Sequence, residues 1–326
     1  GIYSIKDPGA PDWNQGLTLK MWHETCFNDE KFMDFFRKHV SVVKPNIGTS
    51  LTPLSGFYSR IFPMKFILRV LAGLLFHNAQ EHYRDHTFDV LEDLMETVSL
   101  DDLRHESLKC ARYARSWFEE LDSKANRKRG DGSEITVGFP EKSEKAKEHF
   151  KAQFVGGKKK RSRITGALAE MGFISHATIM WKIAIIDDIR FTQKGWDFMM
   201  LENPIIDGGV EEMITYFETG IRFSNEEINF LLEHIEHDIP AEWNAMIKVA
   251  EYIDGGFNRP QKLEEKMSED RTWLTGIPQM RNGIISRMEE LGLVKRNKKG
   301  REVSYQLTEF GEKILRKVQS KLFTWC

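Results

Sequence analysis

Five polar residues near the carboxyl end of the chain share the spacing of one helix face. They are Gln279, Arg281, Asn282, Ser286 and Arg287. Such side chains reach base edges and phosphates when a helix lies in the major groove of DNA. The opposite face is apolar, with hydrophobic residues at steps of three and four: Met280, Ile284, Met288 and Leu291. We therefore predict a helix across residues 277–291 that buries one face and offers Gln279, Arg281, Asn282 and Arg287 to DNA.

A strongly basic hairpin is expected directly after this helix. Gly292 should end the helix in a left-handed conformation, and two strands should then flank the turn at residues 295–301. Five of these seven residues are basic, namely Lys295, Arg296, Lys298, Lys299 and Arg301. A two-stranded ribbon with a cationic tip beside a helix is typical of a winged helix, whose tip lies against phosphates or in a minor groove.

Three stretches of this region resemble the winged-helix modules of MarR- and ArsR-type regulators. They are the run RMEELGLV at 287–294, the basic hairpin, and the run LTEFGEKIL at 307–315. The resemblance covers about the last 90 residues. It implies a winged-helix fold and binding of duplex DNA, although winged helices also serve as protein-binding modules.

A second copy of the pattern precedes the first. Aligning Gly172 with Gly292 also brings Thr192-Gln-Lys-Gly195 close to Thr308-Glu-Phe-Gly311, and the two landmarks recur 120 and 116 residues apart, which indicates an internal duplication. In this middle copy we expect the basic cluster to precede and enter the recognition helix and to contact phosphates. Its members are Lys158, Lys159, Lys160, Arg161 and Arg163. The hairpin from Ser175 to Asp188 is apolar and ends in two acids, so it should pack against protein.

A third, degenerate copy is predicted at 61–140, with helices, a basic turn and a strand at 133–139. The turn offers Arg127, Lys128 and Arg129 to DNA. The fold class that follows is mainly α with small β-wings (α+β), as tandem winged-helix domains plus an N-terminal helical extension. We expect domains at 1–60 (the extension), 61–140, 141–205 and 210–326. The extension is a candidate arm for a protein partner or for self-association.

Periodicity and capping residues predict the remaining helices. Aromatic residues indicate one or two helices across 17–43, and a strongly apolar helix is expected at 62–78. Ser224 and Glu227 form a capping box for a helix through His237, and Pro240 opens a helix ending near Ile253. Further helices are expected at 88–98, 100–121, 141–154, 210–220 and 260–267.

Composition limits the function classes. The formal net charge of −2 over 326 residues means that DNA binding must rest on local clusters. Three scattered cysteines and no long apolar run indicate a reducing, cytoplasmic location without a membrane segment. Motifs of nucleotide hydrolysis and of common hydrolases are absent, so we expect no enzyme and no cofactor. The groups His77, His82, His86 and His234, His237 are interpreted as solvated helix residues rather than metal ligands.

The sequence leaves three functions open. The first is a double-stranded DNA-binding protein with tandem winged helices, acting as a transcriptional regulator. The second is a DNA-recognition component of a larger restriction, replication or defence complex. The third is a winged-helix protein-interaction scaffold without DNA binding, which the near-neutral total charge favours.

Overall fold

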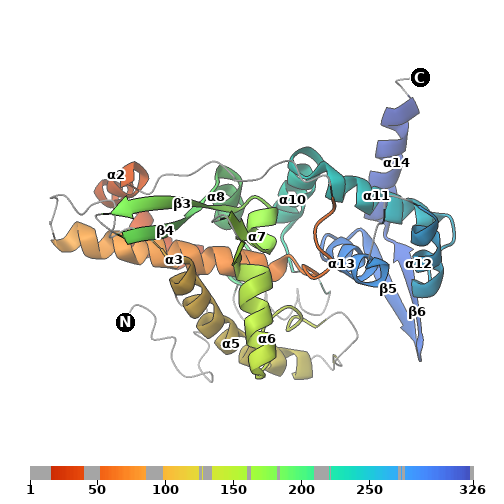
Figure 1. Cartoon of the computed structure of the whole chain (residues 1–326), viewed down its shortest axis with the longest axis horizontal. Helices are drawn as coiled ribbons and strands as arrows, with labels where there is room; N and C mark the ends of the chain where they lie inside the picture. The colour runs from red at the N-terminus through yellow and green to blue at the C-terminus, as the bar shows by residue number, and fades with distance from the viewer. Residues whose placement is uncertain are drawn as a thin grey trace.

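The computed structural model describes a mainly helical chain with small antiparallel hairpins, as the periodicity predicts (Figure 1). The described residues are 16–39, 52–85, 98–124, 127, 134–159, 163–181, 184–208, 220, 222–270, 273 and 276–323. The expected helix at 210–220 lies outside them, except for residue 220, and so does most of the one at 88–98.

The first half of the chain is built on one long helix, α3 (Phe62–Asp85), which runs along the body in Figure 1. The elements around it are α1 (Leu19–Trp22), the π-helix η1 (His23–Phe27), α2 (Glu30–His39), α5 (Leu100–Lys124), α6 (Glu144–Phe150) and the π-helix η2 (Lys151–Val155). These bounds match the helices expected at 17–43, 62–78, 100–121 and 141–154, with α3 continuing seven residues further.

Aromatic packing joins the N-terminal helices to this body. The rings of Trp22 and Phe36 lie 5.1 and 4.5 Å from that of Phe76 on α3. Phe36 also lies 5.9 Å from Trp196, and all but Trp196 of these side chains are buried. Aromatic contacts of this kind stabilise beyond the area they bury. The predicted aromatic helices therefore form part of the core of the protein.

Two cations that interrupt the apolar run of α3 are fully buried. Lys65 donates to the carbonyls of Phe198 and Leu201 and forms an ion pair with Glu227 at 3.0 Å. Arg69 donates to Met199 O at 2.8 Å and pairs with Asp207. The carbonyls belong to the end of α8 (Gln193–Met200) and the residue after it, where a helix leaves its last acceptors unpaired. The two cations thus fix the C-terminus of α8 against α3.

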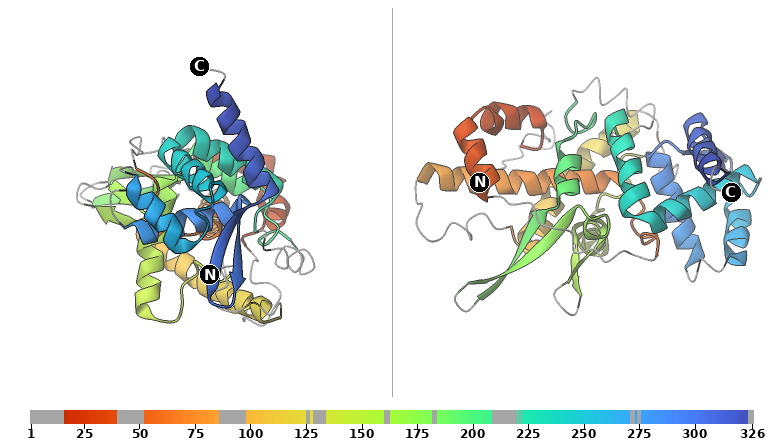
Figure 2. Two further views of the ribbon diagram at one scale, coloured as in Figure 1. Left: turned by 90° about the vertical axis from the view of Figure 1, so that its right-hand side faces the viewer. Right: turned by 90° about the horizontal axis from the view of Figure 1, so that it is seen from above.

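The C-terminal module has the order predicted for a winged helix. It comprises α10 (Asn225–Asp238), α11 (Pro240–Asp254), α12 (Pro260–Glu269), α13 (Ile277–Glu290), β5 (Val294–Lys299), β6 (Glu302–Leu307) and α14 (Glu309–Phe323). The capping box of Ser224 and Glu227 is present, and Pro240 and Pro278 each occupy a first helical turn. Strand β5 pairs antiparallel with β6 from Val294↔Leu307 to Lys299↔Glu302. Figure 2 shows this hairpin projecting from the module.

The two landmarks aligned in the sequence have the same geometry. Gly172 and Gly292 both have positive φ, at 73° and 69°. The hydroxyls of Thr192 and Thr308 donate to the carbonyls of these glycines, each at 2.5 Å. Both hydroxyls also accept a hydrogen bond from a glycine three residues on, Gly195 or Gly311, each at 3.0 Å. A Cβ on Gly195 would lie 1.8 Å from the carbonyl oxygen of Phe173, and a Cβ on Gly311 would lie 2.1 Å from that of Leu293. Neither position has room for a side chain.

The middle copy differs from the C-terminal module before its landmark glycine. A hairpin of β1 (Gly157–Lys159) and β2 (Arg163–Thr165) leads into α7 (Ala167–Glu170), which has only four residues. Our prediction that the basic cluster enters a recognition helix is wrong. Residues 157–159 pair with 163–165 as an antiparallel hairpin, so they do not form the expected helix. Gly156 and Gly166, at the two ends of this hairpin, have positive φ, and a Cβ on Gly166 would lie 2.9 Å from the Cα of Gly156.

The base of the second hairpin of the middle copy packs against protein, in agreement with the prediction from its acidic end. It consists of β3 (Ile174–Trp181) and β4 (Ala184–Phe191), paired antiparallel. Ile189 N donates to Val98 O at 2.8 Å, and Val98 N donates to the Asp188 carboxylate at 3.3 Å. Asp188 is buried and pairs with Arg190. A carboxylate held in this way is turned away from any phosphate.

The strand predicted at 133–139 is wrong for the described residues Glu134–Phe139, which form turns. Val137 N donates to Glu134 O and Phe139 N to Thr136 O. The Asp122 carboxylate accepts from the Thr136 hydroxyl at 3.0 Å. These local bonds satisfy the backbone without a partner strand. The described part of 61–140 therefore contains helices and turns but no wing.

The helices of the described residues include none with the length and hydrophobicity of a membrane span.

His234, which we expected on a hydrated face, is buried. Its ring stacks 5.1 Å from that of Phe173, and its two nitrogens lie 2.8 Å from the Asp238 carboxylate and 2.7 Å from Met171 O. His237 is exposed, as expected.

Candidate nucleic-acid interface

The first turns of α13 are open to solvent, whereas its second half is buried on nearly all sides. Pro278, Gln279 and Asn282 are exposed. From Gly283 to Glu290 every residue except Glu289 is buried, including Ser286. The predicted polar face is therefore available to a partner only near the N-terminus of the helix.

Arg287 is fully buried and cannot contact DNA. Its Nε donates to Glu242 on α11 at 2.7 Å, and both side chains are 0% exposed. Its Nη1 donates to the carbonyl of Tyr58 at 2.6 Å and lies 3.3 Å from that of Ser55. The prediction that Arg287 reads DNA is wrong, because an ion pair and backbone carbonyls occupy its guanidinium.

The segment at 52–61 covers this half of α13. A Cβ on Gly283 would lie 2.6 Å from the Cα of Gly56, and a Cβ on Gly56 would lie 2.3 Å from the carbonyl oxygen of Gln279. Two backbones approach this closely only where both residues lack a side chain. The contact places an N-terminal segment where the middle of a major-groove helix would meet DNA.

A second set of buried charges fastens the end of α13. Glu290 pairs with Arg222 at 3.0 Å and accepts a hydrogen bond from the backbone of Ile61. Arg60 donates to the carbonyl of Ser286 at 3.1 Å. Burial, reinforced by the nearby Arg222, lowers the pKa of Arg60 to about 10. Helix α13 is thus held by segments that lie far from it in sequence.

Arg281 forms an ion pair with an acidic residue of the neighbouring helix. Its Nη1 lies 2.8 Å from Glu264 on α12, and its side chain is 11% exposed. Its Nη2 donates to Asn282 Oδ1 at 2.7 Å. The predicted base-reading group therefore consists of Gln279 and Asn282 in the open, with Arg281 beside them but neutralised.

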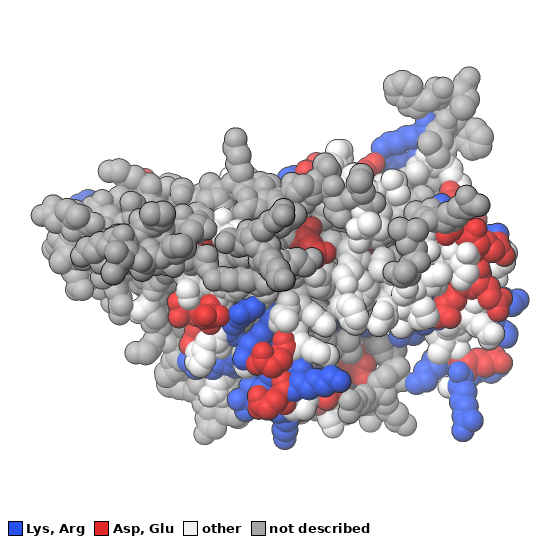
Figure 3. All heavy atoms as spheres, in the orientation of Figure 1, with Lys and Arg blue, Asp and Glu red and all other residues white. Residues whose placement is uncertain are grey.

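The wing carries its positive charge on exposed side chains. Lys295, Lys298, Lys299 and Arg301 are exposed, and Gly300 has the positive φ of 63° that a tight turn requires. Figure 3 shows basic side chains at the tip of the hairpin, while carboxylates gather over α12 beside it. Lys298, Lys299 and Arg301 are therefore accessible, and their contact with DNA stays a prediction.

Arg296 faces inward instead. It pairs with Glu289 at 3.0 Å and lies over the ring of Tyr305 at 5.9 Å. Burial raises the pKa of Glu289, and Arg296 opposes that shift. In this arrangement Arg296 packs the base of the wing against α13 and does not offer its charge to phosphates, contrary to our prediction.

The other predicted cations lie on hairpins or outside the described residues. Lys158 and Lys159 belong to β1, Arg163 belongs to β2, and Lys160 and Arg161 are not among the described residues. In the basic turn predicted for the degenerate copy at 61–140, Arg127 is half-buried, whereas Lys128 and Arg129 lie outside the described residues.

Two features of this region and its surroundings were not predicted from the sequence. One is Glu242, the buried partner of Arg287, which reads as a surface residue of α11. The other is a cavity between α5 and residues 140–143. No spacing pattern identifies either, because both depend on segments meeting in space.

Comparison of the chain with protein-family models, curated proteins and solved structures finds no match.

Proposed function

We propose that this protein binds double-stranded DNA through its C-terminal winged helix, in the role of a transcriptional regulator. The observation that carries the proposal is the row of exposed cations on the β5–β6 hairpin, in the same module as the open N-terminal turns of α13. Lysine and arginine on a projecting ribbon suit phosphate contacts, which supply most of the sequence-independent affinity.

The wing supports a modest number of phosphate contacts. Four exposed cations, Lys295, Lys298, Lys299 and Arg301, give an upper limit of four on this element. Each neutralised phosphate contributes roughly −0.9 to the slope of log affinity against log salt. The wing alone therefore gives a slope no steeper than roughly −4.

We assign recognition of the bases to the first turns of α13. Gln279 and Asn282 are exposed there, and both side chains suit the paired donor and acceptor on adenine in the major groove. Because residues 52–61 cover the second half of α13, the helix would enter the groove by its N-terminal end. We therefore expect the protein to discriminate bases at only one or two positions of its DNA site.

Fluorescence anisotropy with a random 30-base-pair duplex tests the proposal. The double variant Lys295→Gln/Lys299→Gln should bind more weakly than the wild type and show a slope shallower by roughly 2 in a salt titration. Lys20→Gln/Lys31→Gln is the matched control, because it removes two exposed lysines from α1 and α2. Equal slopes in the wild type and both variants would refute binding through the wing.

A protein-interaction scaffold is the second candidate. One observation in its favour is the packing of α13 against residues 52–61. Another is the exposed acid Glu265 on α12, which repels phosphates, whereas Glu264 and Glu269 are paired with Arg281 and Lys266. A scaffold would fail to shift random duplex DNA even at low salt. If DNA does bind, a footprint separates a regulator, which protects a two-fold symmetric site as a dimer, from a component of a larger complex, which covers an extended site as a monomer.

A further inference from the structure

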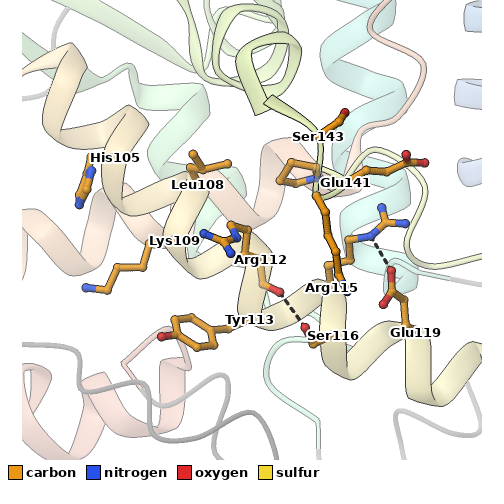
Figure 4. Close-up of a pocket in the computed structure, with 12 residues that line it drawn as sticks. His105, Leu108, Lys109, Arg112, Tyr113, Arg115, Ser116, Glu119, Glu141 and Ser143 are labelled. Atoms are coloured by element: carbon orange, nitrogen blue, oxygen red, sulfur yellow. Dashed lines mark hydrogen bonds and ion pairs between the residues drawn. The ribbon is translucent and has the colours of Figure 1, made fainter. Parts of the chain in front are cut away.

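A cavity of 740 Å³ lies between α5 and the segment at 140–143, away from the winged helix (Figure 4). Its described lining is His105, Leu108, Lys109, Arg112, Tyr113, Arg115, Ser116, Glu119, Pro140, Glu141, Lys142 and Ser143. Cavities that hold small molecules fall in the range of about 300–1,000 Å³. This one is large enough for an organic ligand.

The cavity lining carries more positive than negative charge, with Lys109, Arg112, Arg115 and Lys142 against Glu119 and Glu141. Arg115 is neutralised by Glu119 at 2.7 Å and donates to the carbonyl of Phe139 at 2.8 Å, so its role is structural. Lys109 pairs with Glu106 at 3.2 Å. Within the part of the chain that the structure describes, Arg112 and Lys142 take part in no ion pair.

Arg112 is the charge best placed for a ligand. Figure 4 shows it near the middle of the lining, with Leu108 on one side of it, whereas Arg115 turns to Glu119. Arg112 interacts only weakly with the Glu144 carboxylate, whose pKa is lowered chiefly by its hydrogen bond with Lys147. The Arg112 guanidinium thus keeps its hydrogen-bond donors for a carboxylate or phosphate, which it suits by its planar, forked geometry.

The rest of the lining is apolar in part. On α5, Leu108 lies one turn before Arg112, and Tyr113 lies one turn after Lys109. Pro140 lines the opposite side of the cavity. Sites of this kind bind the apolar body of a ligand on such side chains and orient it with a few polar groups. A free phosphate ion would use only half of the surface.

We propose that this cavity binds a small organic anion, whose carboxylate or phosphate group is held by Arg112 and Lys142 and whose apolar body packs on Leu108 and Tyr113. The proposal is independent of DNA binding, because the cavity shares none of its lining with α13 or the wing.

Isothermal titration calorimetry with phenyl phosphate tests it on the full chain. We expect saturable binding of one equivalent. Inorganic phosphate, which has the charge alone, and benzyl alcohol, which has the ring alone, should each bind at least about tenfold more weakly. Arg112→Gln should weaken phenyl phosphate by about tenfold or more, since it removes a charged hydrogen-bond partner. Arg316→Gln, on α14, is the matched control and should bind as the wild type does.

A second variant separates loss of the site from loss of the fold. Leu108→Trp adds bulk to the cavity and should abolish binding while the circular dichroism melt keeps a single transition. The proposal is overturned if phenyl phosphate does not bind the wild type at 10 mM (~100 times a 0.1 mM site), or if it binds Arg112→Gln equally well. It is also overturned if Arg112→Gln lowers affinity only for duplex DNA, since the surface would then belong to a nucleic acid.

Discussion

The Arg287 guanidinium and the Glu242 carboxylate lie 2.7 Å apart with both side chains wholly excluded from solvent. Glu242 also accepts a hydrogen bond from Leu54 N at 2.9 Å, and Arg287 donates to the carbonyl of Tyr58. The pair therefore joins α11 and α13 to the segment at 52–61. A residue expected to read DNA instead holds α13 in place.

Arg287→Met should destabilise the fold by about 3–5 kcal/mol, because it leaves Glu242 charged and buried without its partner. Adding Glu242→Gln should recover part of this loss, since the amide keeps an acceptor for Leu54 N without the charge. Urea unfolding measures both. Arg316→Ala, in an exposed pair with Glu312, is the control and should change stability by less than about 0.5 kcal/mol. A loss for Arg287→Met no larger than that of the control would contradict the buried pair.

Gly283→Ala should lower the free energy of unfolding by about 1–3 kcal/mol. In an exposed helix the same change stabilises by roughly 0.5–1 kcal/mol, so the sign alone is informative. The physical reason is the Cα of Gly56, 2.6 Å from the new Cβ. Gly157→Ala serves as the control, because its nearest neighbour is the Thr165 hydroxyl at 3.3 Å. A stabilised Gly283→Ala variant would mean that 52–61 does not rest on α13.

Glu264→Gln should raise affinity for duplex DNA by roughly three- to tenfold, because it removes the carboxylate that neutralises Arg281 at 2.8 Å. Glu265→Gln removes an exposed charge from the same helix and should give a smaller gain. The gain from Glu264→Gln should disappear in the double variant with Arg281→Gln. Fluorescence anisotropy at one salt concentration measures all three. Equal gains from the two single variants would show that Arg281 takes no part in binding.

The pair of Lys65 and Glu227 should make stability depend on pH. Burial lowers the pKa of Lys65 to about 8, against the opposing effect of Glu227. Between about pH 8 and 10.5 the unfolded chain therefore binds a proton at this lysine that the folded chain does not. Stability from this group should rise with pH across that window.

The double variant Lys65→Met/Glu227→Gln measures this contribution. Relative to it, the wild type should gain about 1–3 kcal/mol of unfolding free energy between pH 8 and 10.5. Comparison with the variant is needed because tyrosines such as Tyr252, whose pKa is raised to about 12, act in the opposite direction at high pH. Parallel pH profiles for the two proteins would contradict a lowered pKa at Lys65.

Much of the C-terminal module could be predicted because its determinants act over a few residues. Gly292 adopts the left-handed conformation expected of it, Ser224 and Glu227 cap their helix, and the basic turn closes β5 on β6. The middle copy shows the limit of this reasoning. The helix before Gly172 has only four residues. The residues that the alignment assigns to a longer helix pair instead as the β1–β2 hairpin.

By itself, the sequence determined the fold class, the positions of most helices and the cationic wing, since periodicity, capping and turn chemistry depend on near neighbours in the chain. Only the tertiary structure decided which polar residues of α13 remain accessible. Periodicity separates apolar from polar faces, but a buried arginine and an exposed one have the same spacing. The difference comes from residues 52–61 and Glu242, which remove Arg287 from solvent and compensate its charge.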